Sequence, residues 1–125
     1  MFGVLIDPDK QNVRELLETV KICNESDVDY FFVGGSIITQ GDMQKTTRLI
    51  KENSTKPIII FPGNPDQISN YADAILFLSL ISGRNPEFLI GHQVAAAPLL
   101  KKTNLEVIPT GYLLVDCGTT TTAIY

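Results

Sequence analysis

Short runs of consecutive apolar residues, separated by amphipathic stretches, are the feature that most limits how this chain can fold. Strands that are apolar throughout are typical of a parallel sheet covered on its faces by helices. The runs lie at residues 2–6, 30–33, 57–61 and 74–80, and a fifth extended region, interrupted by Pro109 and Gly111, is expected at 106–116. The pattern predicts an α/β fold, either an open doubly wound sheet or a closed barrel.

The stretches between these runs carry helix signals of unequal strength. Asn12 and Glu15 have the spacing of a capping box, which predicts a helix start. Residues 66–71 can hold only a short helix. Asn85, followed by proline, predicts the start of a further helix, which Pro98 should kink or break.

The composition predicts one domain over residues 1–125 and excludes several functions. The net charge is −4 and no basic stripe is present, which argues against nucleic-acid binding. No apolar run is long enough for a membrane span, and no basic segment precedes the first strand. We therefore expect a cytoplasmic protein with reduced cysteines. Both ends of the sequence look cut rather than finished.

Polar residues and glycines follow the first two expected strands. Asp7-Pro8-Asp9-Lys10 ends the first, and Gly34-Gly35-Ser36 ends the second. Parallel α/β folds gather their active groups at the carboxyl ends of strands, where a carboxylate suits a metal and free N–H groups suit a phosphate. Equally, the aspartates can cap a helix and the glycines can serve a tight turn.

Later candidates are weaker. Phe61, at the end of the third strand and close to Gly63, can line an apolar pocket, although an aromatic residue there is more often core. Arg84 can bind a diphosphate, but a lone loop arginine is usually solvated. His92, the only histidine, sits within an expected helix, and a structural role is favoured over catalysis.

Taken in order, the motifs resemble those of the geranylgeranylglyceryl phosphate synthase family and its bacterial heptaprenylglyceryl phosphate relatives, most closely the larger group that includes bacterial members. The matching segments are Leu5-Ile6-Asp7-Pro8-Asp9-Lys10, Phe32-Val33-Gly34-Gly35-Ser36, Ile60-Phe61-Pro62-Gly63, residues 72–80, Arg84-Asn85-Pro86 and residues 108–113. The resemblance covers essentially the whole chain.

The resemblance implies a (β/α)₈ TIM barrel, of which this chain is about the first half, with four to five βα units. It implies transfer of a polyprenyl group from its diphosphate to sn-glycerol 1-phosphate in ether-lipid synthesis. It also implies Mg²⁺ held by Asp7 and Ser36. Gly34, Gly35, Phe61 and Gly63 are the residues expected to bind substrate.

The length departs from the resemblance, because a TIM barrel typically needs about 250 residues. In the family, the glycerol phosphate segment and the plausible general base, a glutamate, lie downstream of the region matched here. We therefore expect this chain to be inactive alone and to form homo-oligomers through open sheet edges. The alternatives are a non-catalytic, self-associating half-barrel module and another phosphate-handling barrel enzyme.

Overall fold

The computed structural model describes residues 1–35 and 41–115, which form a five-stranded sheet with three flanking helices and one π-helical turn. All strand pairs are parallel and the strand order is β1-β2-β3-β4-β5. The elements in chain order are β1 (Gly3–Ile6), α1 (Val13–Asn24), β2 (Tyr30–Gly34), α2 (Met43–Asn53), β3 (Ile58–Phe61), β4 (Ala74–Leu80), η1 (Glu87–Gly91), α3 (His92–Leu100) and β5 (Glu106–Tyr112).

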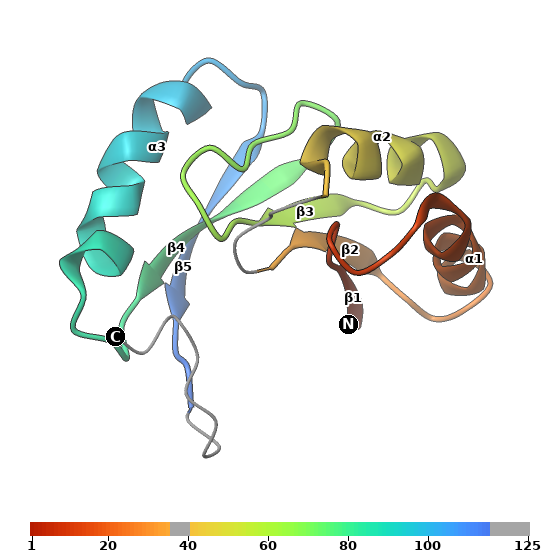
Figure 1. The fold of residues 1–125 in the computed structure, drawn as a ribbon, viewed down its shortest axis with the longest axis horizontal. Coiled ribbons are helices and arrows are strands. Elements are labelled where there is room, and N and C mark those ends of the chain that lie inside the picture. The colour runs from red at the N-terminus through yellow and green to blue at the C-terminus, as the bar shows by residue number, and fades with distance from the viewer. Residues whose placement is uncertain (36–40, 116–125) are drawn as a thin grey trace.

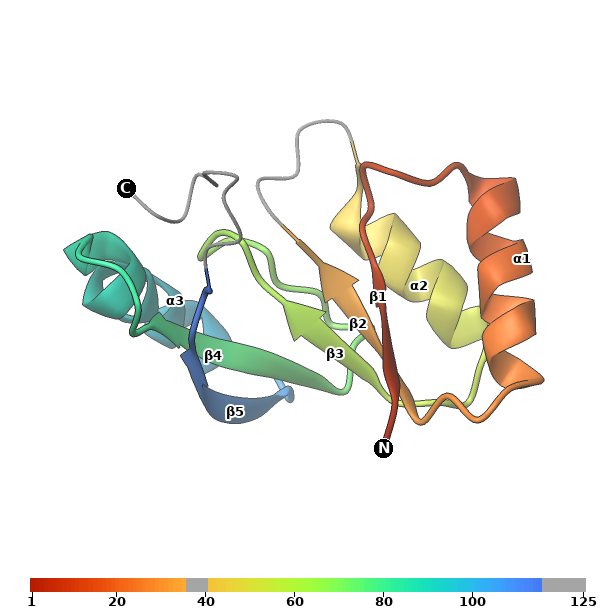
Figure 2. The same cartoon turned by 90° about the horizontal axis from the view of Figure 1, so that it is seen from below.

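The helices cover one face of a curved sheet. Figures 1 and 2 show α1 and α2 beside β1 to β3, and α3 beside β4 and β5. Alternate strand residues, such as Ile6, Val33 and Ile60, are buried beneath these helices at 0 or 1% exposure. The expected α/β fold with a parallel sheet is confirmed.

Helix α1 begins as its sequence predicts. Asn12 accepts a hydrogen bond from the backbone N–H of Glu15 at 3.0 Å, and the Glu15 side chain accepts one from Asn12 at 3.1 Å. This capping box satisfies two donors that a helix start otherwise leaves unpaired. Cys23 lies in the core on the same helix, and burial raises the pKa of its thiol, which keeps it protonated. Cys117 lies outside the described residues.

No helix connects β3 to β4, and the short one that residues 66–71 could have held is absent. Side-chain hydrogen bonds hold this connection instead. Gln44 of α2 donates to the Ile68 carbonyl at 2.8 Å and accepts from the Ser69 hydroxyl at 2.9 Å. Gln67 accepts from the Gly63 N–H at 2.7 Å. An irregular connection with buried polar partners therefore takes the place of a covering helix.

The expected interruption of the fifth strand is wrong. β5 runs unbroken from Glu106 to Tyr112, with Pro109 opposite Phe77 and Gly111 opposite Ser79. Within the described sheet β5 is an edge strand, where a missing N–H on the outer side removes no ladder bond.

Of the two effects expected at Pro98, a kink or a break, the break is absent. The helix neither ends nor breaks there, since α3 continues to Leu100. The irregularity lies earlier, where η1 forms one π-helical turn before α3. The N-cap of η1 is Pro86 and not Asn85 as the sequence predicts, although the Asn85 side chain accepts a hydrogen bond from the Glu87 N–H at 3.0 Å. In the part of the chain that the structure describes, no helix is both long and apolar enough to cross a bilayer.

The face of β1 to β3 opposite α1 and α2 is apolar and open. Leu5, paired with Phe32 in the ladder, is 54% exposed. Within the described sheet β1 and β5 also have unpaired outer edges. Open apolar faces and edges favour pairing with another chain.

We expect the chain to self-associate through this face. Leu5→Lys should shift the species seen by sedimentation velocity toward monomer, because it places a charge on the face that must be buried. Ile22→Lys is the matched control, since Ile22 is 58% exposed but lies on α1. A wild-type chain that sediments as a monomer at all concentrations would contradict the prediction.

Candidate functional site

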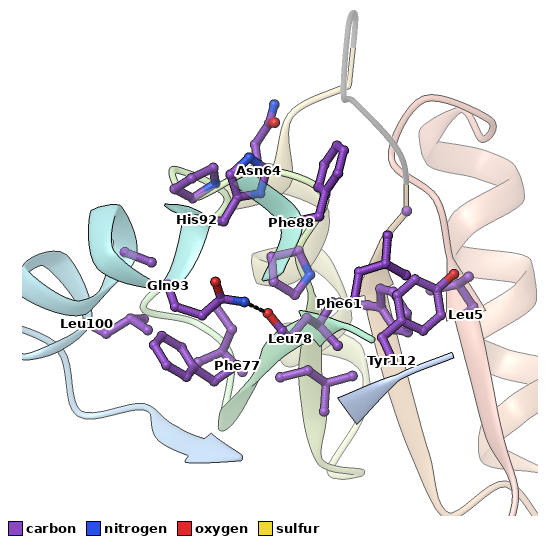
Figure 3. A pocket seen from close by; sticks show the side chains of 18 of the residues that line it. Leu5, Phe61, Asn64, Phe77, Leu78, Phe88, His92, Gln93, Leu100 and Tyr112 are labelled. Atoms are coloured by element: carbon purple, nitrogen blue, oxygen red, sulfur yellow. Dashed lines mark hydrogen bonds between the residues drawn. The ribbon is translucent and has the colours of Figure 1, made fainter. Parts of the chain in front are cut away.

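A cavity of about 470 Å³ opens between the carboxyl ends of β1 to β3, the length of β4, and the helical segment η1–α3. Figure 3 shows side chains from these elements converging on it. Its lining residues are Leu5, Asp7, Lys10, Gly35, Phe61, Pro62, Gly63, Asn64, Pro65, Ile75, Leu76, Phe77, Leu78, Leu80, Phe88, His92, Gln93, Ala96, Leu100 and Tyr112. The cavity is therefore mostly apolar, with a polar end at Asp7 and Lys10.

The polar end is built by the turn after β1. The Asp9 N–H donates to Asp7 Oδ1 at 3.1 Å, and the Lys10 N–H donates to the Asp7 carbonyl at 3.1 Å. The Asp7 side chain, 22% exposed, is held toward the end of β2, where its Oδ2 also meets Lys10 Nζ at 3.3 Å. Asp7 therefore faces the cavity and does not cap α1, whose N-cap is Asn12.

Gly34 and Gly35 adopt backbone conformations that side-chain-bearing residues rarely use, with φ of 141° and 150°. A Cβ on Gly34 would lie 1.9 Å from the Phe61 carbonyl oxygen. A Cβ on Gly35 would lie 3.3 Å from Asp7 Oδ2, so glycine leaves space beside that oxygen. The glycines therefore form the tight turn that the sequence allows. The Gly35 N–H donates to the Phe61 carbonyl at 3.2 Å and is not free for a phosphate, which corrects that expectation for Gly35.

Phe61 lies in a row of aromatic rings packed edge to face. It contacts Phe32 of β2 with centroids 6.0 Å apart and Tyr112 of β5 at 5.6 Å. Its side chain is half-buried and lines the cavity, as does Gly63. Phe61 is therefore a wall of the cavity, and it does not belong to the buried core beneath the helices.

The helical wall contributes residues that sequence reasoning did not place here. Phe88 and His92 pack edge to face at 5.0 Å, and Gln93 donates from Nε2 to the Leu78 carbonyl (Figure 3). The sequence put His92 in a helix away from the strand ends, and only the contact between η1–α3 and β4 brings it to the cavity. Arg84 is exposed and is not among the lining residues.

The described residues contain no group of three or more histidine, cysteine, aspartate or glutamate side chains that could hold a metal. Asp7 is the only carboxylate among the described lining residues. Ser36, the second expected metal ligand, lies outside the described residues. Any metal at this end would have few protein ligands, which is typical of Mg²⁺ bound together with a substrate phosphate.

With this geometry in view, comparison with known proteins identifies the family. A model of the PcrB family matches residues 2–125. The chain belongs to the PcrB family. Its relatives include geranylgeranylglyceryl phosphate synthases from Chitinophaga pinensis, 48% identical over 99% of this chain, and from Flavobacterium johnsoniae, 52% identical over 97%. The chain spans about half the length of these curated relatives, 49% and 50% respectively.

Solved structures agree. The synthase from Thermoplasma volcanium is 37% identical with a TM-score of 0.85, and the match covers 95% of this chain and 49% of that one. The synthase from Thermoplasma acidophilum, solved with its substrate sn-glycerol-1-phosphate, is 35% identical with a TM-score of 0.87 and matches over 96% and 49%. The family resemblance and the TIM-barrel fold class, with this chain matching about half of the barrel, are confirmed.

Gly34→Ala should lower the free energy of unfolding by about 2 kcal/mol or more, because it combines a strained φ with a clash against the β3 backbone. Urea denaturation measures this. Gly111→Ala is the control: its Cβ would have a nearest contact of 3.6 Å, so the change should stay within about 0.5 kcal/mol. Equal unfolding midpoints for the two variants would refute the strain argument.

Proposed function

We propose that this chain forms the diphosphate and prenyl half of the active site of a prenyltransferase, which moves a polyprenyl group from its diphosphate to sn-glycerol 1-phosphate. The observation that supports this most directly is a cavity with a carboxylate at one end and a mostly apolar lining elsewhere. A prenyl diphosphate has the same division into charged head and apolar tail. The family match favours it over other phosphate-handling barrel enzymes.

The polar end suits the diphosphate with Mg²⁺. Asp7 is the described residue that would hold the metal, because glycine at position 35 leaves space beside its Oδ2; Ser36 is proposed as a second ligand. The bound metal would stabilise the negative charge that grows on the leaving diphosphate as its bond to the allylic carbon breaks. The Asp9 N–H orients the Asp7 carboxylate by donating to its Oδ1, and the Lys10 N–H closes the turn by donating to the Asp7 main-chain carbonyl.

The apolar remainder suits the prenyl tail. No helix lies between β3 and β4, and residues of β4 from Leu76 to Leu80 line the cavity. Phe88 and Ala96 line it from the helical side. Burying the hydrocarbon here removes apolar surface from water on both the tail and the wall. This binding energy would hold the reacting carbon beside Asp7 and keep water from competing with the acceptor.

The acceptor hydroxyl needs a base to take its proton when its oxygen bonds to the allylic carbon. No described lining residue is placed for this, because Asp7 is assigned to the metal and His92 lies on the helical wall. We propose that the base and the glycerol phosphate site come from the part of the relatives' length that this chain does not span.

Activity can be tested in a chimera in which residues 2–125 replace the matching half of the Chitinophaga pinensis relative. We expect Mg²⁺-dependent transfer of labelled geranylgeranyl from its diphosphate to sn-glycerol 1-phosphate. Asp7→Asn should lower kcat/KM by about 100-fold or more, because it removes the metal's carboxylate. The 125-residue chain alone should show no turnover.

Asp9→Asn is the matched control within the same turn. Asp9 is exposed and accepts a hydrogen bond from the Gly41 N–H, which an asparagine oxygen can also accept. Its kcat/KM should stay within about threefold of the parent. An inactive chimera would refute the proposed reaction, and equal losses in the two variants would refute the assignment of Asp7.

Phe88→Asp in the chimera should raise the KM for the prenyl diphosphate about tenfold or more, because it places a charge against the tail. Leu89→Asp is the control, since Leu89 is 41% exposed and does not line the cavity. Inhibition by inorganic pyrophosphate, which has no tail, should be unchanged in both. A KM that moves equally in the two variants would contradict this placement of the tail.

A further inference from the structure

The Lys10 side chain lies at the polar end of the cavity. Its ammonium lies 3.3 Å from Asp7 Oδ2, while its side chain is 79% exposed. Ion pairs this exposed contribute little to stability, about 0–1 kcal/mol, and the lysine stem stays flexible. The Lys10 side chain is therefore free to exchange one anionic partner for another.

The charges in the cavity show why a change of partner by Lys10 would matter for binding an anion. Among the described residues that line it, Lys10 is the only lysine or arginine and Asp7 the only carboxylate. A diphosphate brings several negative charges, more than one divalent cation offsets. A cation bound to Asp7 would also repel the nearby ammonium, which must then turn to another anion.

We infer that Lys10 is a diphosphate-binding residue, which pairs with Asp7 in the empty site and moves to the diphosphate oxygens when metal and substrate bind. The inference deepens the proposed function and rests on it for the identity of the substrate. As the bond between the allylic carbon and the diphosphate oxygen breaks, both electrons stay on that oxygen. The Lys10 ammonium offsets this charge as a hydrogen-bond donor and keeps its proton.

The backbone of the turn supports this role. The Lys10 N–H donates to the Asp7 carbonyl and the Asp9 N–H to Asp7 Oδ1, so the main chain holds the carboxylate without help from the lysine side chain. Replacing the ammonium should consequently leave Asp7 in position. Metal binding and diphosphate binding can then be separated experimentally.

The test uses the 125-residue chain with inorganic pyrophosphate as the probe, in the presence of Mg²⁺, by isothermal titration calorimetry. Lys10→Gln should weaken pyrophosphate binding about tenfold or more, and Lys10→Arg by less than about threefold, since it keeps the charge. Lys21→Gln, the same change in the last turn of α1, is the matched control and should have no effect. Mn²⁺ affinity without pyrophosphate, measured by electron paramagnetic resonance, should be unchanged or tighter in Lys10→Gln.

Three outcomes overturn the inference: a wild-type chain that does not bind pyrophosphate, equal affinities in Lys10→Gln and Lys21→Gln, or loss of Mn²⁺ binding in Lys10→Gln. The last would show that Lys10 only supports Asp7. If the chimera transfers no prenyl group while Lys10→Gln still weakens pyrophosphate binding selectively, the role of Lys10 stands and the proposed reaction fails.

Discussion

The candidate site depends on how briefly β3 and β4 pair. Their ladder joins Ile59 to Ala74 and Ile60 to Ile75, whereas β4 pairs with β5 along its full length. β3 ends at Phe61, one residue past this ladder, while β4 continues to Leu80, and no helix connects the two strands. A backbone carbonyl left unpaired there would be costly, and Gln93 satisfies the one at Leu78 from the helical side. The cavity therefore lies where β4 has no β3 partner, and a side chain supplies the hydrogen bond that a neighbouring strand would otherwise supply.

The opposite end of the cavity depends on backbone conformation. Because Gly34 has no Cβ, the end of β2 can approach the Phe61 carbonyl closely. The Gly35 N–H donates to that carbonyl at 3.2 Å. A Cβ at position 35 would lie 3.3 Å from Asp7 Oδ2, so glycine there leaves space beside this oxygen. Among the described lining residues, the lysine and the carboxylate both lie at one end, and the rest of the lining is mostly apolar, as an amphipathic ligand requires.

Several features could be predicted because they depend on neighbouring residues. The apolar runs gave the strands to within about a residue for four of the five, and the capping box at Asn12 and Glu15 formed as its spacing requires. The expected break at Pro98 and the expected interruption at Pro109 were wrong, because the local rules for proline take no account of where the element lies in the fold. An edge strand tolerates a missing N–H, and α3 continues for two residues past its proline.

The sequence by itself determined a parallel α/β fold with Asp7 and the glycine pair at strand ends, because strand periodicity and turn chemistry act over a few residues. It also carried the ordered motifs by which the family is identified. Only the tertiary structure decided that Phe88, His92 and Gln93 share a cavity with Asp7, and that Arg84 does not. These contacts join residues far apart in the chain, and they depend on where β4 leaves β3, which no local pattern encodes.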